Sequence, residues 1–355
     1  TVWTYYVAAD VIEWNYAPTG LDAFTGEPLD QLGTPSAVYM TRTTGRIGGT
    51  YFKAVYREYT DASKTDLEKR NKHLGILGPV LRGEVGHELH VVFKNNAAQP
   101  YSMHPHGVFY DKDNEGASMG PDAGAGASIA PGNTYMYRWP IPDRAGPTDT
   151  ETDSIAWGYH SHISEADIED GLFGALIVYR RGRLGTDGRP KLGTASFARD
   201  REFVLAFIII NENQSSYFAR NLAAFAGNST RTVAELAQLD PAIKSNPSAL
   251  AALLPTSEFT LSNLMHSING LVYGNLRGLD ADMGDRIRFY VLVFGSLFDF
   301  HTIHWHGLTV ESEGHRRDVI EALPATFRVA DARVDAPGRW MMHCHVNDHF
   351  KGGMV

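Results

Sequence analysis

The amino-acid sequence predicts an all-β protein of two β-sandwich domains, with a short helical insertion in the second. Short runs of β-branched and aromatic residues recur along its 355 residues, as is typical of strands. Many of these runs alternate apolar with polar positions, as half-buried strands do. The pattern of the first half then starts again in the second half, roughly 200 residues later at first and roughly 183 later near the end. Such a duplication indicates two domains of one kind.

Length and composition fit this architecture and exclude other classes. A chain of 355 residues, 43% of them hydrophobic, has room for two globular domains. The net charge of −9 argues against nucleic acid as a partner, because phosphate binding requires a basic surface. No apolar run reaches the length of about 18 residues that a membrane span needs. The chain starts at Thr1 without a signal-peptide pattern, so we expect that a leader has been removed or the chain trimmed.

The first domain is expected over residues 1–182. Residues 2–8 are rich in β-branched and aromatic side chains and predict a strand. Apolar side chains alternate over 89–93, which predicts a half-buried strand. Two more strands are predicted over 135–139 and 172–179, and the last of these closes the domain.

The second domain is expected over residues 196–355, after a basic linker with several glycines at 180–194. A strongly apolar strand is predicted over 203–210, and residues 287–293 alternate like the matching strand of the first domain. Residues 233–254 break the β pattern, because they are rich in alanine and place leucines at helical spacing. Two prolines divide this segment, so we expect one or two short surface helices there.

Eight histidines occur as four His-x-His pairs, two pairs in each domain at matching positions. In a strand, residues i and i+2 face the same side, so each pair presents two imidazoles together. The pairs are His104 and His106, His160 and His162, His304 and His306, and His343 and His345. Such clustering is more than composition alone explains, and it indicates metal ligands.

The only cysteine, Cys344, lies between the last two of these histidines and has no partner for an internal disulfide. His349 follows it by five residues, and Met354 follows His349 by another five. One thiolate, two imidazoles and a weak thioether form the ligand set of a blue-copper electron-transfer centre. The second imidazole is therefore expected from the histidine cluster at 301–306.

Together, the four pairs, one of them written His-Cys-His, resemble the signature of the multicopper oxidases. The resemblance is closer to the ceruloplasmin and hephaestin branch than to plant or fungal laccases. Three further motifs that carry it are Tyr51-Phe52-Lys53-Ala54-Val55-Tyr56, His73-Leu74-Gly75-Ile76-Leu77-Gly78-Pro79 and Trp340-Met341-Met342-His343-Cys344-His345-Val346. The resemblance implies cupredoxin-like Greek-key β-sandwich domains, copper as the cofactor, and an extracytoplasmic location, either secreted or periplasmic.

The resemblance also implies a copper role for each matching residue. A type 1 copper, which accepts single electrons from the substrate, would be held by His301, Cys344, His349 and Met354. A cluster of three coppers, which reduces O2 to water, would be held by the paired histidines. His104 and His304 match the type 2 copper, and His106, His160, His162, His306, His343 and His345 match the type 3 pair. Each functional unit would hold four coppers.

The first domain lacks the strong type 1 ligands. Tyr101, Ser161 and Ala166 stand at the three positions that match the two histidines and the cysteine of the second domain. The resemblance therefore implies one type 1 site for each chain, in the second domain.

A cluster that needs histidine pairs from both domains must lie at a domain interface. In ceruloplasmin-like proteins it lies between the first and the last of six domains arranged in a ring. Three copies of a two-domain chain would rebuild that ring, because head-to-tail contacts close under cyclic symmetry. We therefore expect a homotrimer with intersubunit clusters, and a monomer with an internal cluster is the alternative.

The residues around the type 1 site bear on the substrate. Asp348 and His266 match two positions that hold Fe(II) in ceruloplasmin-like ferroxidases, although both can instead orient His349 through hydrogen bonds. Two glutamates of that site are replaced by Leu261 and Leu297. The loss of two hard oxygen ligands weakens an iron site. The sequence therefore favours a laccase-like oxidase of phenols or aromatic amines.

Two other interpretations stay open. The first is a ferroxidase or another metal-ion oxidase, in which Glu258 and Asp299 would replace the lost glutamates. The second is a copper-binding structural relative without turnover, against which the complete ligand set argues. In both enzymatic interpretations the catalytic residues are Cys344, His349 and Asp348, and the partners are O2 and a small reducing substrate.

Overall fold

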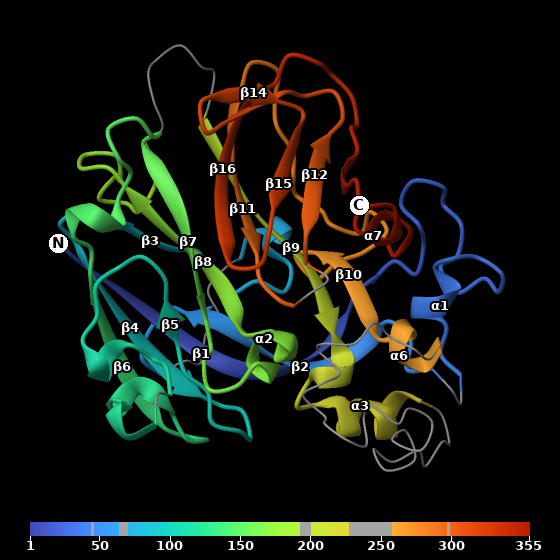
Figure 1. Cartoon of the computed structure of the whole chain (residues 1–355), viewed down its shortest axis with the longest axis horizontal. Helices are drawn as coiled ribbons and strands as arrows, with labels where there is room; N and C mark the ends of the chain where they lie inside the picture. The colour runs from blue at the N-terminus through green and yellow to red at the C-terminus, as the bar shows by residue number, and fades with distance from the viewer. Residues whose placement is uncertain (44–45, 64–69, 119, 192–199, 227–257, 297–298) are drawn as a thin grey trace.

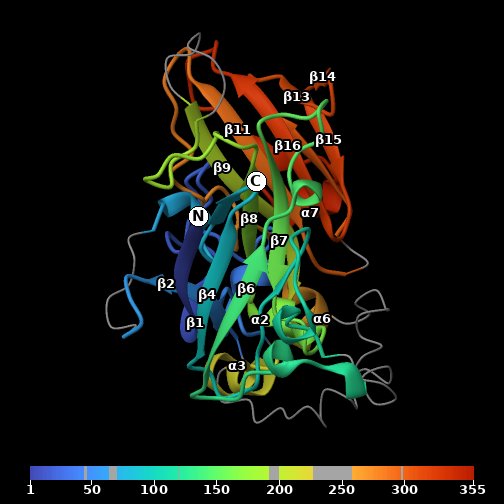
Figure 2. The ribbon, with the colours of Figure 1, turned by 90° about the vertical axis from the view of Figure 1, so that its left-hand side faces the viewer.

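The computed structural model describes the chain except for residues 44–45, 64–69, 119, 192–199, 227–257 and 297–298. It confirms the predicted all-β class, because its strands form four sheets and its described helices are short (Figure 1). The sheets pair into two sandwiches, one from each half of the chain. Figure 2 shows the second sandwich, in orange and red, above the first, in blue and green.

The first sandwich packs two four-stranded sheets against each other. One sheet has the order β2-β1-β4-β6, formed by β1 (Val2–Asn15), β2 (Thr50–Tyr59), β4 (Glu88–Asn95) and β6 (Thr134–Pro140). The other has the order β3-β8-β7-β5, formed by β3 (Leu81–Glu84), β5 (His104–Pro105), β7 (Ser154–His160) and β8 (Phe173–Tyr179). Leu89, Val91 and Phe93 of β4 are buried between the sheets, as their alternation predicted.

The second sandwich packs a six-stranded sheet against a three-stranded one. The larger sheet has the order β10-β9-β11-β16-β13-β14, formed by β9 (Asp200–Asn211), β10 (Leu264–Ile268), β11 (Arg286–Val293), β13 (Val310–Ser312), β14 (His315–Arg317) and β16 (Thr326–Arg333). The smaller has the order β15-β12-β17, formed by β12 (His301–Trp305), β15 (Val319–Ala322) and β17 (Met342–Cys344). Cys344 and Met354 belong to the core between these sheets, so any site built on them is buried.

The described helices lie at the ends of strands. They are α1 (Ala37–Met40), α2 (Ala166–Asp170), α3 (Phe218–Phe225), α6 (Glu258–Ser262) and α7 (Asn347–Lys351). Single 3₁₀ turns are η1 (Lys72–Leu74), η2 (Lys112–Asn114), η3 (Gly120–Asp122), η4 (Ala125–Ala127), η5 (Asp143–Ala145) and η6 (Glu212–Gln214). The predicted insertion at 233–254 lies outside the described residues. None of the described helices is long and apolar enough to cross a membrane.

The sequence predicted the positions of the strands more accurately than their ends. The expected strand at 2–8 is much longer, because β1 continues to Asn15 and pairs with β2 from Tyr6 to that end. The strands expected at 203–210 and 287–293 are β9 and β11, each extended by a few residues or less. Ladder hydrogen bonds to neighbouring strands set these ends, and a single sequence does not contain them.

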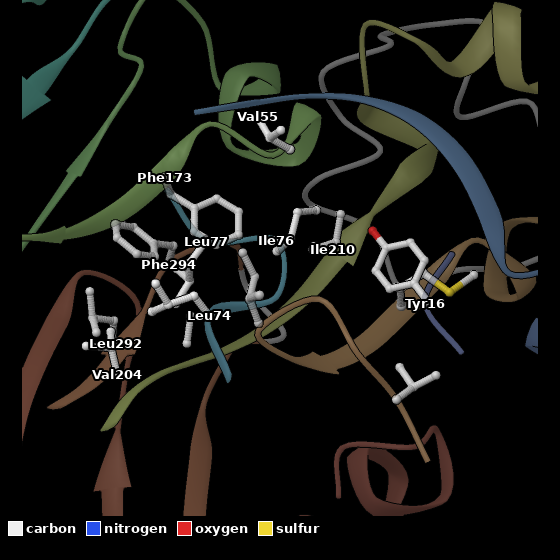
Figure 3. Close-up of a cluster of buried hydrophobic side chains, with 14 of the residues drawn as sticks. Tyr16, Val55, Leu74, Ile76, Leu77, Phe173, Val204, Ile210, Leu292 and Phe294 are labelled. Carbon is white, nitrogen blue, oxygen red and sulfur yellow. The ribbon is translucent and has the colours of Figure 1, made fainter. Parts of the chain in front are cut away.

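The two sandwiches share one hydrophobic core cluster (Figure 3). Phe173 of β8 and Val55 of β2 lie in it with Ile210 of β9 and Leu292 of β11. Burying apolar surface that belongs to both halves stabilises their relative position. The sandwiches are therefore not independent lobes on a flexible linker.

A buried polar contact fixes the orientation of this joint. Glu202 of β9 accepts hydrogen bonds from Tyr179 of the first sandwich (2.7 Å) and from Tyr290 of the second (2.6 Å). The same carboxylate pairs with Arg82 at 3.2 Å. Ser154 of β7 lies 2.7 Å from the Tyr290 hydroxyl. Such directional contacts allow fewer orientations than apolar packing alone does.

An arm of the first half lies along the second sandwich. Residues 16–43, here called the arm, follow β1 in the connection to β2 and include α1. In Figure 1, α1 lies beside α6 and near α7. The Ala23 amide donates to the Tyr273 carbonyl (3.0 Å), and the Thr19 hydroxyl donates to Asn275 (2.7 Å). The arm thus brings residues near the N-terminus to the same end of the molecule as the C-terminal helix.

Candidate metal centre

Three potential metal ligands converge inside the second sandwich. They are His301 at the start of β12, Cys344 at the end of β17, and His349 on α7, and all are at most 5% exposed. The Cys344 sulfur lies 3.7 Å from His301 Nδ1 and 3.5 Å from His349 Nδ1. Their ligand atoms all lie within 4.8 Å of one another. One thiolate and two imidazoles at this spacing suit a single copper ion.

Strand pairing and one turn bring these residues together. Antiparallel pairing of β12 with β17 sets Ile303 opposite Cys344, which places His301 close to the thiol. The chain then turns through α7 and returns, and the Cys344 amide donates to the Met354 carbonyl at 3.1 Å. Gly353 makes this return with φ of 105°, a conformation that favours glycine. Met354 is fully buried beside the site.

A buried carboxyl group orients one ligand. Asp299 is fully buried, and its Oδ1 lies 3.1 Å from His301 Nε2. The backbone amides of Ile209 (2.7 Å) and Ser296 (2.9 Å) also donate to Asp299. Three donors stabilise a charged carboxylate, so His301 donates from Nε2 and keeps the Nδ1 lone pair for a metal.

The site also favours the thiolate that copper requires. Burial opposes ionisation, but the interactions of the sulfur with the rings of His301 and His349 lower the pKa of the Cys344 thiol to about 6. His301 shows the complementary effect, because the Asp299 hydrogen bond raises its pKa although burial acts the other way. A thiolate at Cys344 and imidazoles at His301 and His349 are a suitable ligand set for a copper ion.

The second sandwich contains a histidine cluster immediately next to this site. The His306 and His343 Nε2 atoms lie 3.1 Å apart, and the ring of His345 lies 5.3 Å from that of His343. His304 donates from Nδ1 to the Asp318 carbonyl (2.9 Å), and His343 does so to the Cys344 carbonyl (2.8 Å). Both therefore present Nε2 for a metal, and His343 is connected to Cys344 by a peptide bond and a hydrogen bond.

The first sandwich contains a matching cluster. Pairing of β5 with β7 sets His104 opposite His160, and the His106 and His160 Nε2 atoms lie 3.2 Å apart. The ring of His162 lies 5.0 Å from that of His104 and 5.2 Å from that of His160. Burial lowers the pKa of His106 to about 4 and that of His160 to about 3. Neutral imidazoles are the form that binds metal.

The two clusters do not meet within one chain. All eight histidines are described, and the ring contacts between them join only histidines of the same cluster. Aromatic side chains of the second sandwich cover the first cluster instead. The ring of Phe327 lies 5.3 Å from that of His106, and the ring of Phe294 lies 6.1 Å from that of His160.

The first sandwich has no counterpart of the cysteine-containing site. Tyr101 donates to Asp170 (2.7 Å) and Ser161 donates to Asp167 (2.6 Å), all four of them buried. Ala166 begins α2 and offers no ligand atom. Internal hydrogen bonds satisfy these polar groups, so the place needs no metal.

The residues expected to bear on the substrate differ in their exposure to solvent. Asp348 is exposed on α7, and His266 of β10 is buried with its ring 5.7 Å from that of His349. Leu261 is 37% exposed on α6, whereas Leu297 lies outside the described residues. Glu258 forms an ion pair with Arg46.

Sequence reasoning missed the role of Asp299. We had considered it as a substitute ligand for substrate iron, but it is fully buried and bonded to His301, so no substrate reaches it. The signal was an acidic residue two positions before a ligand and within an apolar stretch. Tyr39 of the arm was missed entirely, because nothing local to its sequence connects it with the site.

The fold and these clusters of potential ligands are those expected of a copper oxidase. The chain belongs to the multicopper oxidase family, whose profiles match residues 59–183 and 246–355. Along its full length it is similar to hephaestin and ceruloplasmin.

The relatives of the chain are much longer than the chain itself. It is 38% identical to hephaestin of Homo sapiens over 99% of this chain and 28% of that protein. It is 38% identical to ceruloplasmin of Ovis aries, over 99% of this chain and 32% of that protein. It is 36% identical to "Ferroxidase HEPHL1" of Mus musculus, over 99% of this chain and 28% of that one. The chain thus spans about a third or less of the length of these relatives.

Solved structures agree on the fold. A multicopper oxidase crystal structure superposes with a TM-score of 0.53 at 16% identity, covering 99% of this chain and 86% of that one. A copper nitrite reductase from Nitrosomonas europaea superposes with a TM-score of 0.57 at 14% identity, covering 100% and 92%. These likenesses confirm the cupredoxin-like sandwiches.

Replacing Asp299 by Asn should raise the reduction potential of a copper ion bound by His301 and Cys344. The loss of the negative partner of His301 weakens the binding of oxidised copper more than that of reduced copper. Each tenfold change in the ratio of these two affinities shifts the potential by roughly 60 mV. Redox titration of the blue absorption band measures this shift. Asp170→Asn, which alters the carboxyl group bonded to Tyr101 at the matching place in the first sandwich, is the control and should leave the potential unchanged. An unaltered potential in Asp299→Asn would show that the carboxyl group does not act on the copper.

Proposed function

We propose that this protein is a ferroxidase, which oxidises Fe(II) one electron at a time and reduces O2 to water. Our preference from sequence for phenols is not confirmed, because the relatives include a protein named ferroxidase at 36% identity over 99% of this chain. Copper would supply electron acceptance at one site and O2 reduction at the other. His301, Cys344, His349 and Met354 would hold the type 1 ion.

The observation that carries this proposal is a carboxylate and an imidazole beside His349. Asp348 precedes His349 on α7 and is exposed, so it is accessible to a cation from solvent. The buried Nδ1 atom of His266 has no hydrogen-bond partner among the described residues. Carboxylate oxygen and imidazole nitrogen suit iron as ligands. The net charge of −9 also favours a cationic substrate.

The chain offers a short route from this site to the histidine cluster. An electron taken up beside His349 reaches the Cys344 sulfur, 3.5 Å from His349 Nδ1. The Cys344 carbonyl accepts the hydrogen bond of His343, a cluster residue, at 2.8 Å. His345 follows on the other side. The arrangement supports transfer through the backbone of Cys344.

Oxidation of an aromatic donor is the second candidate. The ring of Phe300 lies 5.5 Å from that of His349, and Phe300 is 50% exposed. Leu261 adds exposed apolar surface on α6. An aromatic ring held against Phe300 would be in electron-transfer distance of His349.

We propose a cyclic homotrimer in which four coppers serve each functional unit. Each cluster would take His104, His106, His160 and His162 from one subunit and His304, His306, His343 and His345 from the next. The separation of the two clusters within one chain supports this assembly over a monomer with an internal cluster. We also propose domain limits of 1–182 and 196–355, and an extracytoplasmic location in line with the family resemblance.

Oxygen uptake with Fe(II) and with a bulky phenol tests the substrate. The copper-loaded protein should saturate at micromolar Fe(II), and Asp348→Asn should raise the KM for Fe(II) by about tenfold or more, because one ligand loses its charge. The KM for the phenol should stay unchanged, as should both values in Asp149→Asn, an exposed carboxylate of the first sandwich. Fast phenol oxidation with negligible Fe(II) oxidation would reverse the order of the two candidates.

Mixing two inactive variants tests the shared cluster. His104→Ala removes a ligand from the first sandwich, and His304→Ala removes one from the second. Subunit exchange between them should restore roughly a quarter of the sites, because random neighbours then pair two intact halves. Oxygen uptake before and after exchange measures the recovery. A mixture of Asp348→Asn with His304→Ala is the control, because exchange between these two variants creates no additional intact clusters. No recovery, with exchange shown by mass spectrometry, would mean that each cluster forms within a single chain.

A further inference from the structure

The arm of the first sandwich reaches the type 1 site of the second. Its backbone is fixed there at several points, including the Val272 amide, which donates to the Tyr16 carbonyl (3.0 Å). The Trp14 indole, just before the arm, donates to the Gly270 carbonyl (2.7 Å). These anchors hold α1 and its Tyr39 beside β10 and α7. Figure 1 shows α1, in blue, on the same side of the molecule as the dark red α7.

Tyr39 extends the series of rings that leads away from His349. The His266 ring lies 5.7 Å from that of His349, and the Tyr39 ring lies 5.4 Å from that of His266, edge to face. Tyr39 is half-buried, so one side of it remains open to solvent. No hydrogen bond of its hydroxyl is found within the described part of the chain. Burial raises the pKa of Tyr39, and the negative charge of the nearby Asp348 raises it further.

Asp348, Tyr39 and His266 thus lie around His349, and among the described residues no side-chain hydrogen bond is found for the carboxylate of Asp348, the hydroxyl of Tyr39 or the Nδ1 atom of His266. Asp348 is exposed, Tyr39 has a free hydroxyl, and the Nδ1 atom of His266 is buried without a partner although only 6% of His266 is exposed. A buried imidazole nitrogen without a hydrogen bond is costly unless a ligand satisfies it. Carboxylate and phenol oxygens are hard donors, which favour Fe(III) over Fe(II).

We propose that Tyr39 supplies a phenolate ligand to the iron held by Asp348 and His266, so that the first sandwich completes the substrate site of the second. This inference rests on the proposed ferroxidase function and extends it by one residue. Tyr39 thus takes the place of a carboxylate that Leu261 no longer provides. Because phenolate prefers the oxidised metal, it lowers the potential of the iron and favours its oxidation.

The step balances without any further reagent. The Tyr39 O–H bond breaks as the oxygen–iron bond forms, and the proton leaves to water at this exposed edge. Fe(II) becomes Fe(III) and loses one electron, which passes towards His349. The oxidant is O2, which the oxidase activity consumes: four such steps and four protons reduce one O2 to two waters.

The alternative is that Tyr39 only packs against His266. Two substitutions separate these roles, because Tyr39→Phe removes the hydroxyl and keeps the ring, whereas Tyr39→Leu removes both. A packing role predicts a defect in Tyr39→Leu alone. A ligand role predicts a defect of similar size in both variants. Tyr6→Phe, in β1 of the first sandwich, controls for the loss of a tyrosine hydroxyl elsewhere.

The test is visible spectroscopy of the full chain, freed of copper so that the blue band does not overlap, and titrated with ferric citrate. The wild type and Tyr6→Phe should develop a phenolate-to-iron charge-transfer band, and Tyr39→Phe should show none. In the copper-loaded protein, Tyr39→Phe should raise the KM for Fe(II) by about tenfold and leave oxidation of a bulky phenol unchanged.

The outcomes separate this inference from the proposed function. If the wild type binds Fe(III) without the band, and Tyr39→Phe binds it as tightly, Tyr39 is not a ligand while the ferroxidase proposal stands. A defect confined to Tyr39→Leu also overturns the inference, because it reveals packing alone. If the wild type neither binds iron nor oxidises Fe(II), both proposals fall together.

Discussion

The pairing of β12 with β17 is the constraint on which the rest of the site depends. Its register sets Ile303 opposite Cys344 and His304 opposite His343. One ladder therefore positions ligands for two kinds of metal site at once, because alternate residues of a strand face opposite sides. A slip of one residue would turn His301 to the opposite face of the sheet and separate it from the thiol. The hydrophobic core of the second sandwich, which includes Cys344, makes such a slip costly.

The first sandwich shows that the same strand arrangement can carry either a set of metal ligands or a set of internal hydrogen bonds. It has the same strand arrangement around its histidine cluster, with His104 opposite His160. Where the second sandwich has a thiol and imidazoles, the first has Tyr101 and Ser161, each bonded to a buried carboxyl group. The fold thus fixes the positions and the side chains decide the chemistry. The arm of the first sandwich lies beside the site of the second, where the ring of Tyr39 is 5.4 Å from that of His266.

The sequence contained the strands and the histidine sets, because both depend on short-range patterns. Alternation over 89–93 predicted β4, and the His-x-His spacing predicted clusters on strand faces. It did not contain the placement of Tyr39, which reaches His266 through an arm that is anchored by contacts far apart in the chain. The role of Asp299 was missed for a related reason, since its burial depends on the amide of Ile209 in another strand. The predicted laccase-like specificity depended on two leucines, of which only Leu261 is described.

The central claim is that each chain has one site for electron uptake, in its second sandwich, and lends half of a copper cluster to each of two neighbours. Anomalous diffraction from crystals of the copper-loaded protein at the copper edge tests it most directly. The account predicts one isolated copper for each chain at Cys344 and none at Ser161. It also predicts a group of three coppers between His104 of one subunit and His304 of the next. Copper beside Ser161, or a three-copper group bound by a single chain, would contradict the account.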